Sequence, residues 1–477
     1  MFALKCFIIF ISVSYCYGFA LPFEGLYELQ IIHYNDFHAR FEETSVETPT
    51  CRFNNASCLG GFPRLFKQIM TLKKEKPDSI LLNAGDSYQG TYWYTLLKWK
   101  VILEFMNLLP NDAHILSSAG EVEFTDPREV TSRLSRELSE RGVDIIILLS
   151  HCGLDVDKDI AHNYGQHIDI IVGGHTHSLL WNGPSPSGEA VAGPYPVFIE
   201  SADQKHKVLI VQASAFSKYM GSLSVFFDYR GEYVKWEGGP IFLNRSMPED
   251  EDIKKRLKPY AEMVHRAEQV VIGETVNTLY ADDCIYGECA LGDLLVDAMN
   301  EYAKLNYKSS NSYISFIQRG NIKSTIPNGE ITKGEIFELL PFNDRIQTFE
   351  LQGKYIAKAL ERSVIHGWSM DPFKGPYILQ VAGLKVTYDM KQPEGGRVTS
   401  VLVGDSKTPL DPEQVYQVTA PAYLADGGDG FTMFSEGRKN VQVIGRDEKI
   451  LEAFIRTHSP LNVTTDGRIV INQFSFT

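Results

Sequence analysis

Aspartate and histidine residues gather at four places in the first half of the chain, each directly after an apolar run. The four segments read HYNDFHAR, NAGDSYQG, LSHCG and GGHTHS. Their candidate metal ligands are Asp36, His38, Asp86, His151, His175 and His177. Carboxylates and imidazoles in this number suit two divalent cations with one aspartate bridging both, and zinc, manganese and iron are all chemically plausible.

The order and setting of these segments carry more weight than any one of them. A single D-x-H or H-x-H pair is a weak signal, because an isolated histidine is usually just a hydrogen-bonded polar residue. Four such segments in order, each at the end of a predicted strand, form a strong signal. The sequence therefore predicts a metal site built from strand ends.

The elements that must position these ligands alternate between apolar strands and helices from Leu26 to about Tyr233. The expected strands read LYELQIIHYND, SILLNAGDS, VDIIILLSHCG, IDIIVGGHTHS, VLIVQASA and LSVFFDY, and the expected helices read GGFPRLFKQIMTLKKEK, YWYTLLKWKVILEFMNLL and VTSRLSRELSERG. Continuous apolar strands that end in polar turns indicate a layered α/β sheet with functional groups at the strand ends.

Length and pattern predict more than one domain. A chain of 477 residues is too long for one ordinary core. A charged helix with few apolar positions at 246–270 is expected to connect a first domain at 21–245 to a second at 271–477. The second domain mixes helices such as LGDLLVDAMNEYAKL and GKYIAKALERSV with strands and Gly-rich loops.

The N-terminus reads MFALKCFIIFISVSYCYGFALPFEG, with one lysine, an apolar run and then small residues. This pattern predicts a secretory signal peptide at 1–20, and a buried N-terminal strand is the alternative. The C-terminal VINQFSFT has no apolar tail, so neither a transmembrane anchor nor a lipid-anchor signal is expected. The mature protein is expected to be secreted and extracellular.

Cysteines and glycosylation triplets fit that expectation. Cys51 and Cys58, and likewise Cys284 and Cys289, are closely spaced in polar sequence, which in an oxidising compartment suggests two local disulfides. Cys152 is then expected to be a small buried unpaired thiol. Asn-X-Ser/Thr triplets, which predict glycosylation but also arise by chance, begin at Asn55, Asn244 and Asn462.

Composition and charge exclude some partners. The chain is 44% hydrophobic and 22% charged, as globular proteins are, and its formal net charge is −14. A polyanion such as nucleic acid or an anionic membrane surface would be repelled in the absence of a basic patch, and the sequence shows none.

The four ligand segments are also where the chain resembles a known family. Over essentially its whole mature length it is similar to the 5'-nucleotidase/apyrase family of metallophosphoesterases. The segment GDSYQGTYWYTLLKWKV looks most like the secreted salivary apyrases of blood-feeding insects. The resemblance implies a helix-flanked β-sandwich followed by an α/β nucleotide-binding domain. It also implies one metal held by Asp36, His38, Asp86 and His177, and a second by Asp86, His151 and His175.

One stretch departs from the family pattern. Where the family has G-N-H-E-x-D, whose Asn ligates the second metal and whose His and Asp stabilise the transition state, this chain reads LLPNDAHILSSAGEVEF, Leu108 to Phe124. A whole block is absent near residue 117, with several strands. The nearby His114 precedes the motif position and is expected to be an ordinary surface or core residue. The second metal site is therefore expected to be weakened and hydrolysis slow, by roughly 10² to 10⁴.

In the second domain the resemblance implies nucleotide binding between two aromatic rings. Phe342 and Tyr423 would stack on the base, although core packing is the alternative, and Asp429 would accept from ribose hydroxyls. The family's N-G-G-G-I-R is replaced by Gln318, Arg319, Gly320, Asn321, Ile322 and Lys323. Lysine offers a point charge where arginine offers a fork, so nucleotide affinity is expected to fall unless Arg319 compensates.

Two functions of different classes follow. The first is a secreted antihaemostatic protein that inhibits ADP-dependent platelet aggregation by binding adenine nucleotides or a platelet surface receptor, with hydrolysis impaired. The second is an active divalent-metal-dependent phosphohydrolase of extracellular ATP, ADP or AMP, with the gap arising from a splice form or incomplete transcript. An unstable product of a defective transcript is a third alternative. The missing motif favours the first.

Overall fold

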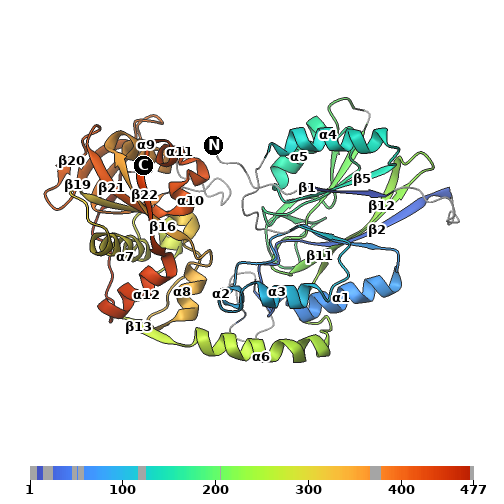
Figure 1. Cartoon of the computed structure of the whole chain (residues 1–477), viewed down its shortest axis with the longest axis horizontal. Helices are drawn as coiled ribbons and strands as arrows, with labels where there is room; N and C mark the ends of the chain where they lie inside the picture. The colour runs from blue at the N-terminus through green and yellow to red at the C-terminus, as the bar shows by residue number, and fades with distance from the viewer. Residues whose placement is uncertain are drawn as a thin grey trace. The chain divides into compact units, whose positions relative to one another are not determined.

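The computed structural model describes residues 25–45, 51, 58–115, 125–204, 206–365 and 378–472, and the backbone of residues 8–13. The chain forms two compact units, Ala3–Met263 and Val264–Thr477 (Figure 1). The boundary between them falls within helix α6 (Glu251–Glu268), the charged helix that the sequence predicts. No helix among the described residues is long and apolar enough to span a bilayer.

The first unit contains two five-stranded sheets. One sheet has the order β1 (Ile8–Val13), β5 (Ile145–Ser150), β6 (Ile170–Val172), β10 (Lys207–Val211) and β9 (Val197–Glu200). The other has the order β12 (Tyr233–Phe242), β11 (Tyr219–Phe227), β2 (Tyr27–Tyr34), β3 (Ile80–Asn83) and β4 (Ala113–His114). Ile31 of the second sheet and Ile147 of the first lie in one apolar core, so the sheets form a sandwich.

Helices cover both outer faces of this sandwich. Figure 1 shows α4 and α5 along one side and α1 and α3 along the other. The helices are α1 (Phe62–Glu75), α2 (Tyr92–Leu97), α3 (Trp99–Met106), α4 (Pro127–Glu140) and α5 (Leu154–Tyr164), and a short pair of strands, β7 (Leu179–Leu180) and β8 (Val191–Gly193), lies apart from the two sheets. The predicted layered α/β architecture is confirmed.

One stretch that the sequence predicts as a single helix forms two helices in the structure. The apolar run YWYTLLKWKVILEFMNLL breaks between α2 and α3 at Lys98, whose φ of 61° is left-handed. The break lets Trp93 from α2 and Phe105 from α3 both contact Phe41, with ring centroids 5.0 and 5.5 Å away. Shared packing on one aromatic ring thus overrides the continuous helical pattern.

Strands missing near residue 117 would leave open sheet edges, and β4 and β5 are the strands on either side of that point. β4 has only two residues and is the last strand of its sheet. β5 is followed at its outer side by β1, which pairs antiparallel along its whole length from Ile8 opposite Ser150 to Val13 opposite Ile145. The strand alternative for the N-terminal segment is therefore what the full chain adopts over six residues, and removal of a signal peptide stays a prediction.

The second unit holds two more sheets and a separate strand pair. Their orders are β17 (Leu379–Ala382), β14 (Tyr313–Gln318), β21 (Val415–Pro421), β16 (Arg345–Gln352) and β22 (Lys439–Arg446); β20 (Thr408–Pro409), β19 (Val398–Val403), β18 (Leu384–Asp389) and β23 (Ile469–Asn472); and β13 (Val271–Thr275) with β15 (Gly329–Thr332). The helices are α7 (Ala290–Asn306), α8 (Lys333–Leu339), α9 (Gly353–Ser363), α10 (Ala422–Ala425), α11 (Thr432–Gly437) and α12 (Asp447–His458). Apolar clusters fill the space between these elements.

Both predicted disulfides are present. Cys51 pairs with Cys58 and Cys284 with Cys289, with Cα atoms 5.6 and 4.9 Å apart. Cys152 is buried as expected, but it is disulfide-bonded, so the prediction of an unpaired thiol is wrong. Its partner lies outside the described residues, where a local spacing rule gives no information.

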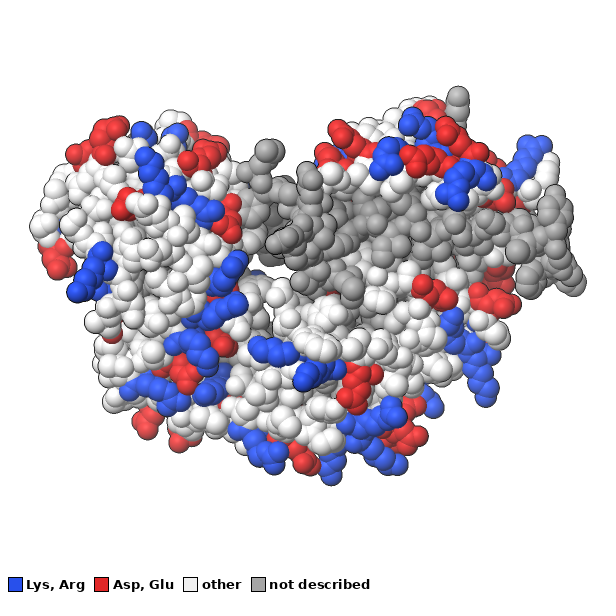
Figure 2. All heavy atoms as spheres, in the orientation of Figure 1, with Lys and Arg blue, Asp and Glu red and all other residues white. Residues whose placement is uncertain are grey.

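Two of the three glycosylation triplets lie in described segments. Asn462 is exposed and Asn244 is half-buried, while Asn55 lies outside the described residues. In the face that Figure 2 shows, acidic and basic side chains are interspersed over both units, so no single-sign patch is visible there.

Candidate metal and nucleotide sites

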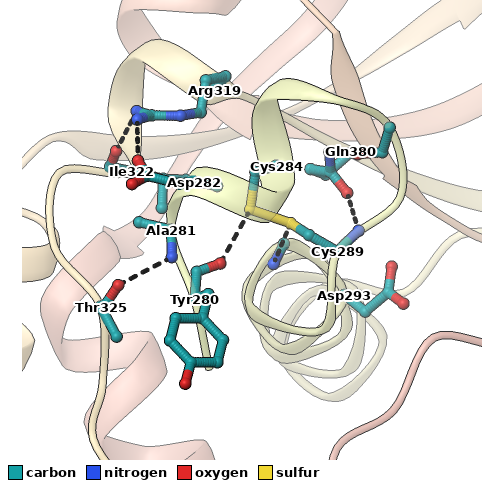
Figure 3. Close-up of a disulfide and its surroundings, with 12 residues drawn as sticks. Tyr280, Ala281, Asp282, Cys284, Cys289, Asp293, Arg319, Ile322, Thr325 and Gln380 are labelled. Carbon is teal, nitrogen blue, oxygen red and sulfur yellow. Dashed lines mark hydrogen bonds and ion pairs between the residues drawn. A yellow bond between two sulfur atoms is a disulfide. The ribbon is translucent and has the colours of Figure 1, made fainter. Parts of the chain in front are cut away.

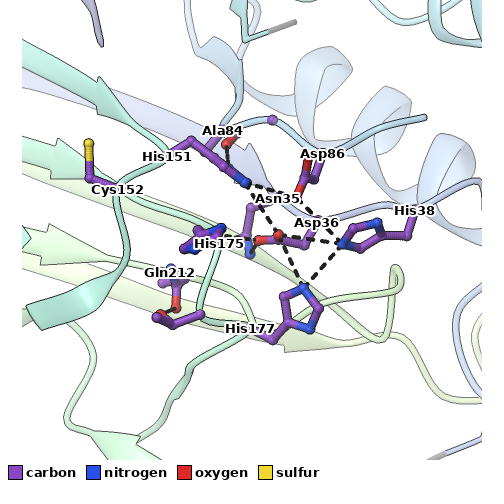
Figure 4. A network of polar contacts seen from close by, with 12 residues as sticks. Asn35, Asp36, His38, Ala84, Asp86, His151, Cys152, His175, His177 and Gln212 are labelled. Atoms are coloured by element: carbon purple, nitrogen blue, oxygen red, sulfur yellow. Dashed lines mark hydrogen bonds and ion pairs between the residues drawn. The ribbon is translucent and has the colours of Figure 1, made fainter. Parts of the chain in front are cut away.

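The topology of the first unit brings the four ligand segments to one end of the sandwich. β2 and β3 are parallel neighbours in one sheet, and β5 and β6 are parallel neighbours in the other. The ligands that follow the carboxyl ends of these strands therefore lie close together, as Figure 4 shows. They are Asp36 and His38 after β2, Asp86 after β3, His151 after β5, and His175 and His177 after β6. All six predicted metal ligands come together.

Asp36, His38 and His177 form the first cluster, with one ligand atom from each within 4.8 Å of the others. Asp36 Oδ1 lies 3.3 Å from His177 Nε2 and 3.7 Å from His38 Nε2, and the two imidazole nitrogens are 3.1 Å apart. Ligand atoms around a tetrahedral zinc with bonds of ~2.1 Å are about 3.4 Å apart, so this spacing suits one shared cation.

Asp86, His151 and His175 form the second cluster. Asp86 Oδ2 lies 3.0 Å from His151 Nε2 and also 3.8 Å from His38 Nε2 of the first cluster. This position between the clusters suits the bridging role that the resemblance implies for Asp86.

One atom argues most directly for a cation. Asp36 is fully buried, yet its Oδ1 accepts no hydrogen bond, and a third imidazole nitrogen, His151 Nε2, lies 3.8 Å away. A buried carboxylate oxygen without a hydrogen bond is costly unless a positive partner faces it. The residues therefore fit a divalent pair, which when bound would act as a Lewis acid on phosphoryl oxygens and activate a water.

Backbone carbonyls orient two of the rings. His38 Nδ1 donates to Gln89 O and His151 Nδ1 donates to Ala84 O, both at 2.6 Å. Because a carbonyl can only accept, each Nδ1 carries a proton and Nε2 is the nitrogen that faces the cluster, where it would bind a cation in its deprotonated form. Asp36 is fixed in the same way, since its Oδ2 accepts from Asn35 Nδ2 and His175 N.

The pKa values reflect this crowding of opposite charges. Although burial opposes it, contact with His177 and His38 holds the pKa of Asp36 well below its usual range. Burial would lower the pKa of His151, but the carboxylates of Asp86 and Asp36 raise it to about 9. Burial lowers the pKa of His175, which keeps that imidazole neutral and available as a ligand.

The backbone at the site is unusual. Five of the six ligands, all except His151, have a positive φ between 48° and 79°. A left-handed backbone at residues other than glycine, asparagine and aspartate is uncommon, and constrained φ/ψ values cluster at functional sites. The tight turns that follow β2, β3 and β6 thus direct the candidate ligands at the end of each strand towards the ligands at the ends of the neighbouring strands.

A buried polar network supports the loop that carries His175 and His177. Asp157 Oδ1 accepts from Ser150 Oγ at 2.5 Å, while Gln212 Oε1 accepts from Ser178 N at 2.7 Å and from Thr176 Oγ1 at 3.2 Å. Asp157 and Gln212 have no exposed surface, and burial raises the pKa of Asp157 to about 7. Sequence reasoning missed both residues, because neither stands at a strand end with a ligand pattern.

Glycine is required beside the ligands. A Cβ on Gly174 would lie 2.8 Å from His151 Nδ1 and 3.1 Å from Asp36 Oδ2. Glycine at position 174, in the segment GGHTHS, therefore allows the backbone that follows β6 to lie directly against two candidate ligands.

No described side chain supplies the missing asparagine. The two asparagines next to the ligand turns are engaged elsewhere: Asn35 bonds Asp36 and the backbone of Ala213 and Ser214, and Asn83 bonds Tyr34, Ser87 and Gly85. His114 is exposed on β4, as predicted. Residues 116–124, where the family motif would begin, lie outside the described residues.

In the second unit, five predicted residues form what we call the nucleotide cluster: Gln318, Lys323, Phe342, Tyr423 and Asp429. Phe342 and Tyr423 are each 45% exposed, which argues against core packing and leaves both rings accessible for stacking. Lys323 Nζ lies 5.3 Å from the centre of the Phe342 ring, and Tyr423 donates its hydroxyl to Asp429 Oδ1 at 2.9 Å.

Residues that the sequence did not single out hold this cluster. Arg362 on α9 donates to the carbonyl of Asp429, and Asp344 accepts from the backbone N–H of Tyr423. The segment GGDG makes a tight turn, with Asp429 left-handed at φ 51°, and a Cβ on Gly428 would lie 2.4 Å from the Tyr423 ring. These contacts depend on tertiary packing and leave no local pattern.

Three buried side-chain oxygens in the segments near this cluster have no hydrogen-bond partner among the described residues. Gln318 Oε1, Asn321 Oδ1 and Asn343 Oδ1 are buried and make no hydrogen bond within the described structure. Partial desolvation, followed by the positive charge of Arg319, lowers the pKa of the Lys323 ammonium. Unsatisfied acceptors next to a cation and two rings suit a ligand with both donors and negative charge.

Arg319 is engaged by contacts near its own turn. Its guanidinium donates to the carbonyl of Ile322 at 2.6 Å and faces Asp282 at 3.5 Å, beside the Cys284–Cys289 disulfide (Figure 3). The side chain is thus occupied by its own turn and by the disulfide loop. It lies close enough to lower the pKa of Lys323, and its contribution to phosphate binding stays a prediction.

Known proteins resemble this chain over nearly its full length. It is 34% identical to an apyrase of Tabanus yao, covering 94% of each chain, and 32% identical to the 5'-nucleotidase of Mus musculus, covering 95% of this chain and 92% of the mouse protein. The chain belongs to the 5'-nucleotidase family.

Domain and structure comparisons agree with that membership. Residues 271–436 match the family model of the 5'-nucleotidase C-terminal domain. The crystal structure of a 5'-nucleotidase precursor from Thermus thermophilus is similar, with a TM-score of 0.74 and 26% identity over 94% of this chain and all of that one. A metallophosphoesterase-type sandwich and a nucleotide-binding-type domain are therefore the two parts of this family member.

The alignment also bears on the missing block. The match to the Tabanus yao apyrase runs over 525 positions, more than the 477 residues of this chain. The relative therefore carries residues that have no counterpart here. This excess agrees with the loss of a block that the sequence motif indicates.

Proposed function

We propose that this family member is a secreted antihaemostatic protein that binds adenine nucleotides, above all ADP, and hydrolyses them slowly. ADP is the nucleotide that matters, because its capture would inhibit ADP-dependent platelet aggregation. A platelet surface receptor is the other target that the sequence leaves open. Active hydrolysis of ATP, ADP or AMP is the alternative function.

One observation carries the proposal: the ligand-binding groups are retained while the catalytic motif is not. Six metal-ligand candidates converge on one end of the sandwich, and two exposed aromatic rings stand beside Lys323 and Asp429. The Asn-His-Asp set of the family motif has no counterpart in the chain sequence between Leu108 and Phe124. Binding needs the first groups, whereas fast phosphoryl transfer also needs the second.

The loss of this motif should slow phosphoryl transfer for a specific chemical reason. During attack on phosphorus, negative charge builds on the equatorial oxygens, and a nearby protonated imidazole stabilises it. Removing such a group costs roughly 10² to 10⁴ in rate. The alternative is supported by the nearly complete ligand set, so rate measurement decides between the two.

The deciding experiment uses the mature protein secreted from insect cells. Phosphate release from ADP and AMP is measured with calcium, magnesium, manganese or zinc, and ADP binding is measured by calorimetry on the same preparation. We expect near one-to-one ADP binding and turnover far below that of the Tabanus yao apyrase assayed in parallel. Turnover at ordinary enzymatic rates contradicts the proposal.

Platelet aggregation separates nucleotide capture from receptor blockade. A protein that captures ADP inhibits only when it matches the ADP concentration, and its effect does not grow with preincubation time. A hydrolase inhibits more the longer it is preincubated with ADP. Inhibition of aggregation by a second agonist that does not act through ADP, at unchanged potency, would favour the receptor target over nucleotide capture.

A further inference from the structure

A third group of possible metal ligands lies in the second unit and shares no residue with the nucleotide cluster. It consists of Glu288, Asp293 and Asp466, and one carboxylate oxygen from each lies within 4.8 Å of the other two. Glu288 precedes α7, Asp293 lies on the first turn of that helix (Figure 3), and Asp466 precedes β23. We call these three residues the acidic cluster.

Asp293 is the member that points to a ligand. Its side chain is only 1% exposed, and neither of its carboxylate oxygens accepts a hydrogen bond within the described structure. Arg468 Nε lies 3.4 Å from Asp293 Oδ1, but this N–H donates to Asp466 Oδ1 at 3.0 Å. Burial raises the pKa of Asp293 to about 8, which reflects the cost of a buried charge without donors. Asp293 therefore needs either a cation or a proton.

The other two carboxylates are held in place and can still bind an ion. Glu288 Oε1 accepts from the backbone N–H groups of Asp466 and Gly467, at 2.7 and 2.8 Å, and its Oε2 accepts from that of Ile469 at 2.8 Å. Asp466 accepts one hydrogen bond from Arg468 at each oxygen. Because a carboxylate oxygen has two lone pairs, Glu288 Oε2 and both Asp466 oxygens retain one for a cation.

The charges around Asp293 favour a divalent cation. Arg468 also donates to both oxygens of Asp297, at 2.7 and 3.2 Å, so its hydrogen bonds are divided between two other carboxylates. Lys385 contributes a second positive charge, which lowers the pKa of Asp466. Four carboxylates thus face two cationic side chains, and the fully ionised group carries two excess negative charges; the carboxylates are those of Glu288, Asp293, Asp297 and Asp466.

The donor atoms favour calcium over the metals expected in the first unit. All donors of the acidic cluster are carboxylate oxygens, which hard cations prefer, whereas the imidazole-rich clusters of the first unit suit zinc. Oxygens on opposite sides of a calcium ion with bonds of ~2.4 Å are about 4.8 Å apart, so the cluster fits within this coordination sphere. Calcium also tolerates irregular geometry, unlike magnesium.

We propose that Glu288, Asp293 and Asp466 bind one calcium ion, which joins the start of α7 to the segment before β23. The ion stabilises the second unit and takes no part in the chemistry of the nucleotide. This site is therefore independent of the proposed function and is tested separately.

Calcium binding to the full chain is measured by calorimetric titration after zinc has filled the first unit and the excess zinc has been removed. We expect one calcium ion per chain and a rise in the unfolding temperature when calcium is added. Asp293→Asn is expected to abolish both effects. The variant should fold normally without calcium, because an amide resembles the neutral acid in shape and charge.

Asp447→Asn is the matched control. Asp447 is also a buried carboxyl on the first turn of a helix, α12, and burial raises its pKa to about 7, but it does not belong to the acidic cluster. This variant should bind calcium as tightly as the native protein does.

Asp466→Asn tests the site without disturbing a buried position, since the Asp466 side chain is 59% exposed. It should weaken calcium binding by about tenfold, because it removes one negative charge beside the ion. This variant alone decides the test if Asp293→Asn does not fold. A native protein that binds no calcium, or binding that keeps its native strength in either cluster variant, overturns the proposal and leaves a proton on Asp293.

Discussion

The two units of this protein have departed from their relatives in different ways. The first unit brings its six candidate metal ligands together, but its sequence lacks the stretch in which the family resemblance implies a catalytic motif. The second unit matches the C-terminal family model over 271–436 and differs at single side chains such as Lys323. Under the proposed function, the loss of a block in the first unit would slow hydrolysis in one step, whereas single substitutions in the second unit would only change nucleotide affinity.

Chimaeras joined within α6 test this contrast with the largest expected effect. The first unit of the Tabanus yao apyrase fused to the second unit of this protein should turn over ADP roughly 10² to 10⁴ faster than this protein. The reciprocal chimaera should stay at the low rate, because it lacks the motif. Phosphate release at saturating ADP is the measurement, and gain of turnover by the reciprocal chimaera would contradict the contrast.

Metal affinity should depend on the absence of a side chain at Gly174, which lies against two of the candidate ligands. Gly174→Ala places a methyl group 2.8 Å from His151 Nδ1 and should weaken binding of manganese or zinc by about 10- to 100-fold. Gly239→Ala on β12 is the matched control, since nothing lies within 4 Å of its Cβ. Calorimetric titration of the metal-free protein checks both, and equal affinities would show that His151 and Asp36 are not ligands.

The aromatic rings should matter for nucleotide and not for metal. Tyr423→Ala and Phe342→Ala should each weaken ADP binding about tenfold, within the ~1–3 kcal/mol that one stacked base contributes. Tyr229→Ala, in the first unit and 73% exposed, is the control. Calorimetric titration with ADP measures the affinity of each variant. Unchanged ADP affinity in both Tyr423→Ala and Phe342→Ala would show that the two rings do not bind the base.

The smallest expected effect concerns Lys323. Lys323→Arg restores the family residue and should tighten ADP binding by about threefold to tenfold, since a guanidinium binds phosphate through two donors. Because the pKa of Lys323 is lowered, this side chain loses its positive charge at a lower pH than an ordinary lysine does. Affinity of the native protein should therefore fall in alkaline buffer while that of the variant persists.

Much of the fold and site follows from local patterns in the sequence. Apolar runs ending in Asp and His locate β2, β3, β5 and β6, and parallel pairing then brings their ends together. What local patterns miss is set by distant packing: the break at Lys98, the support from Asp157 and Arg362, and the disulfide at Cys152. The pairing of β1 with β5 was equally hidden, because the same residues also match a leader peptide.

The left-handed turns of the metal site have one last consequence. Each such residue holds roughly 1–3 kcal/mol of conformational tension, and the packing of the surrounding sandwich must offset it. Substitutions that loosen the packing behind β2, β3 and β6 should therefore displace the ligand side chains before they unfold the sandwich, because relaxation of these turns recovers part of that energy.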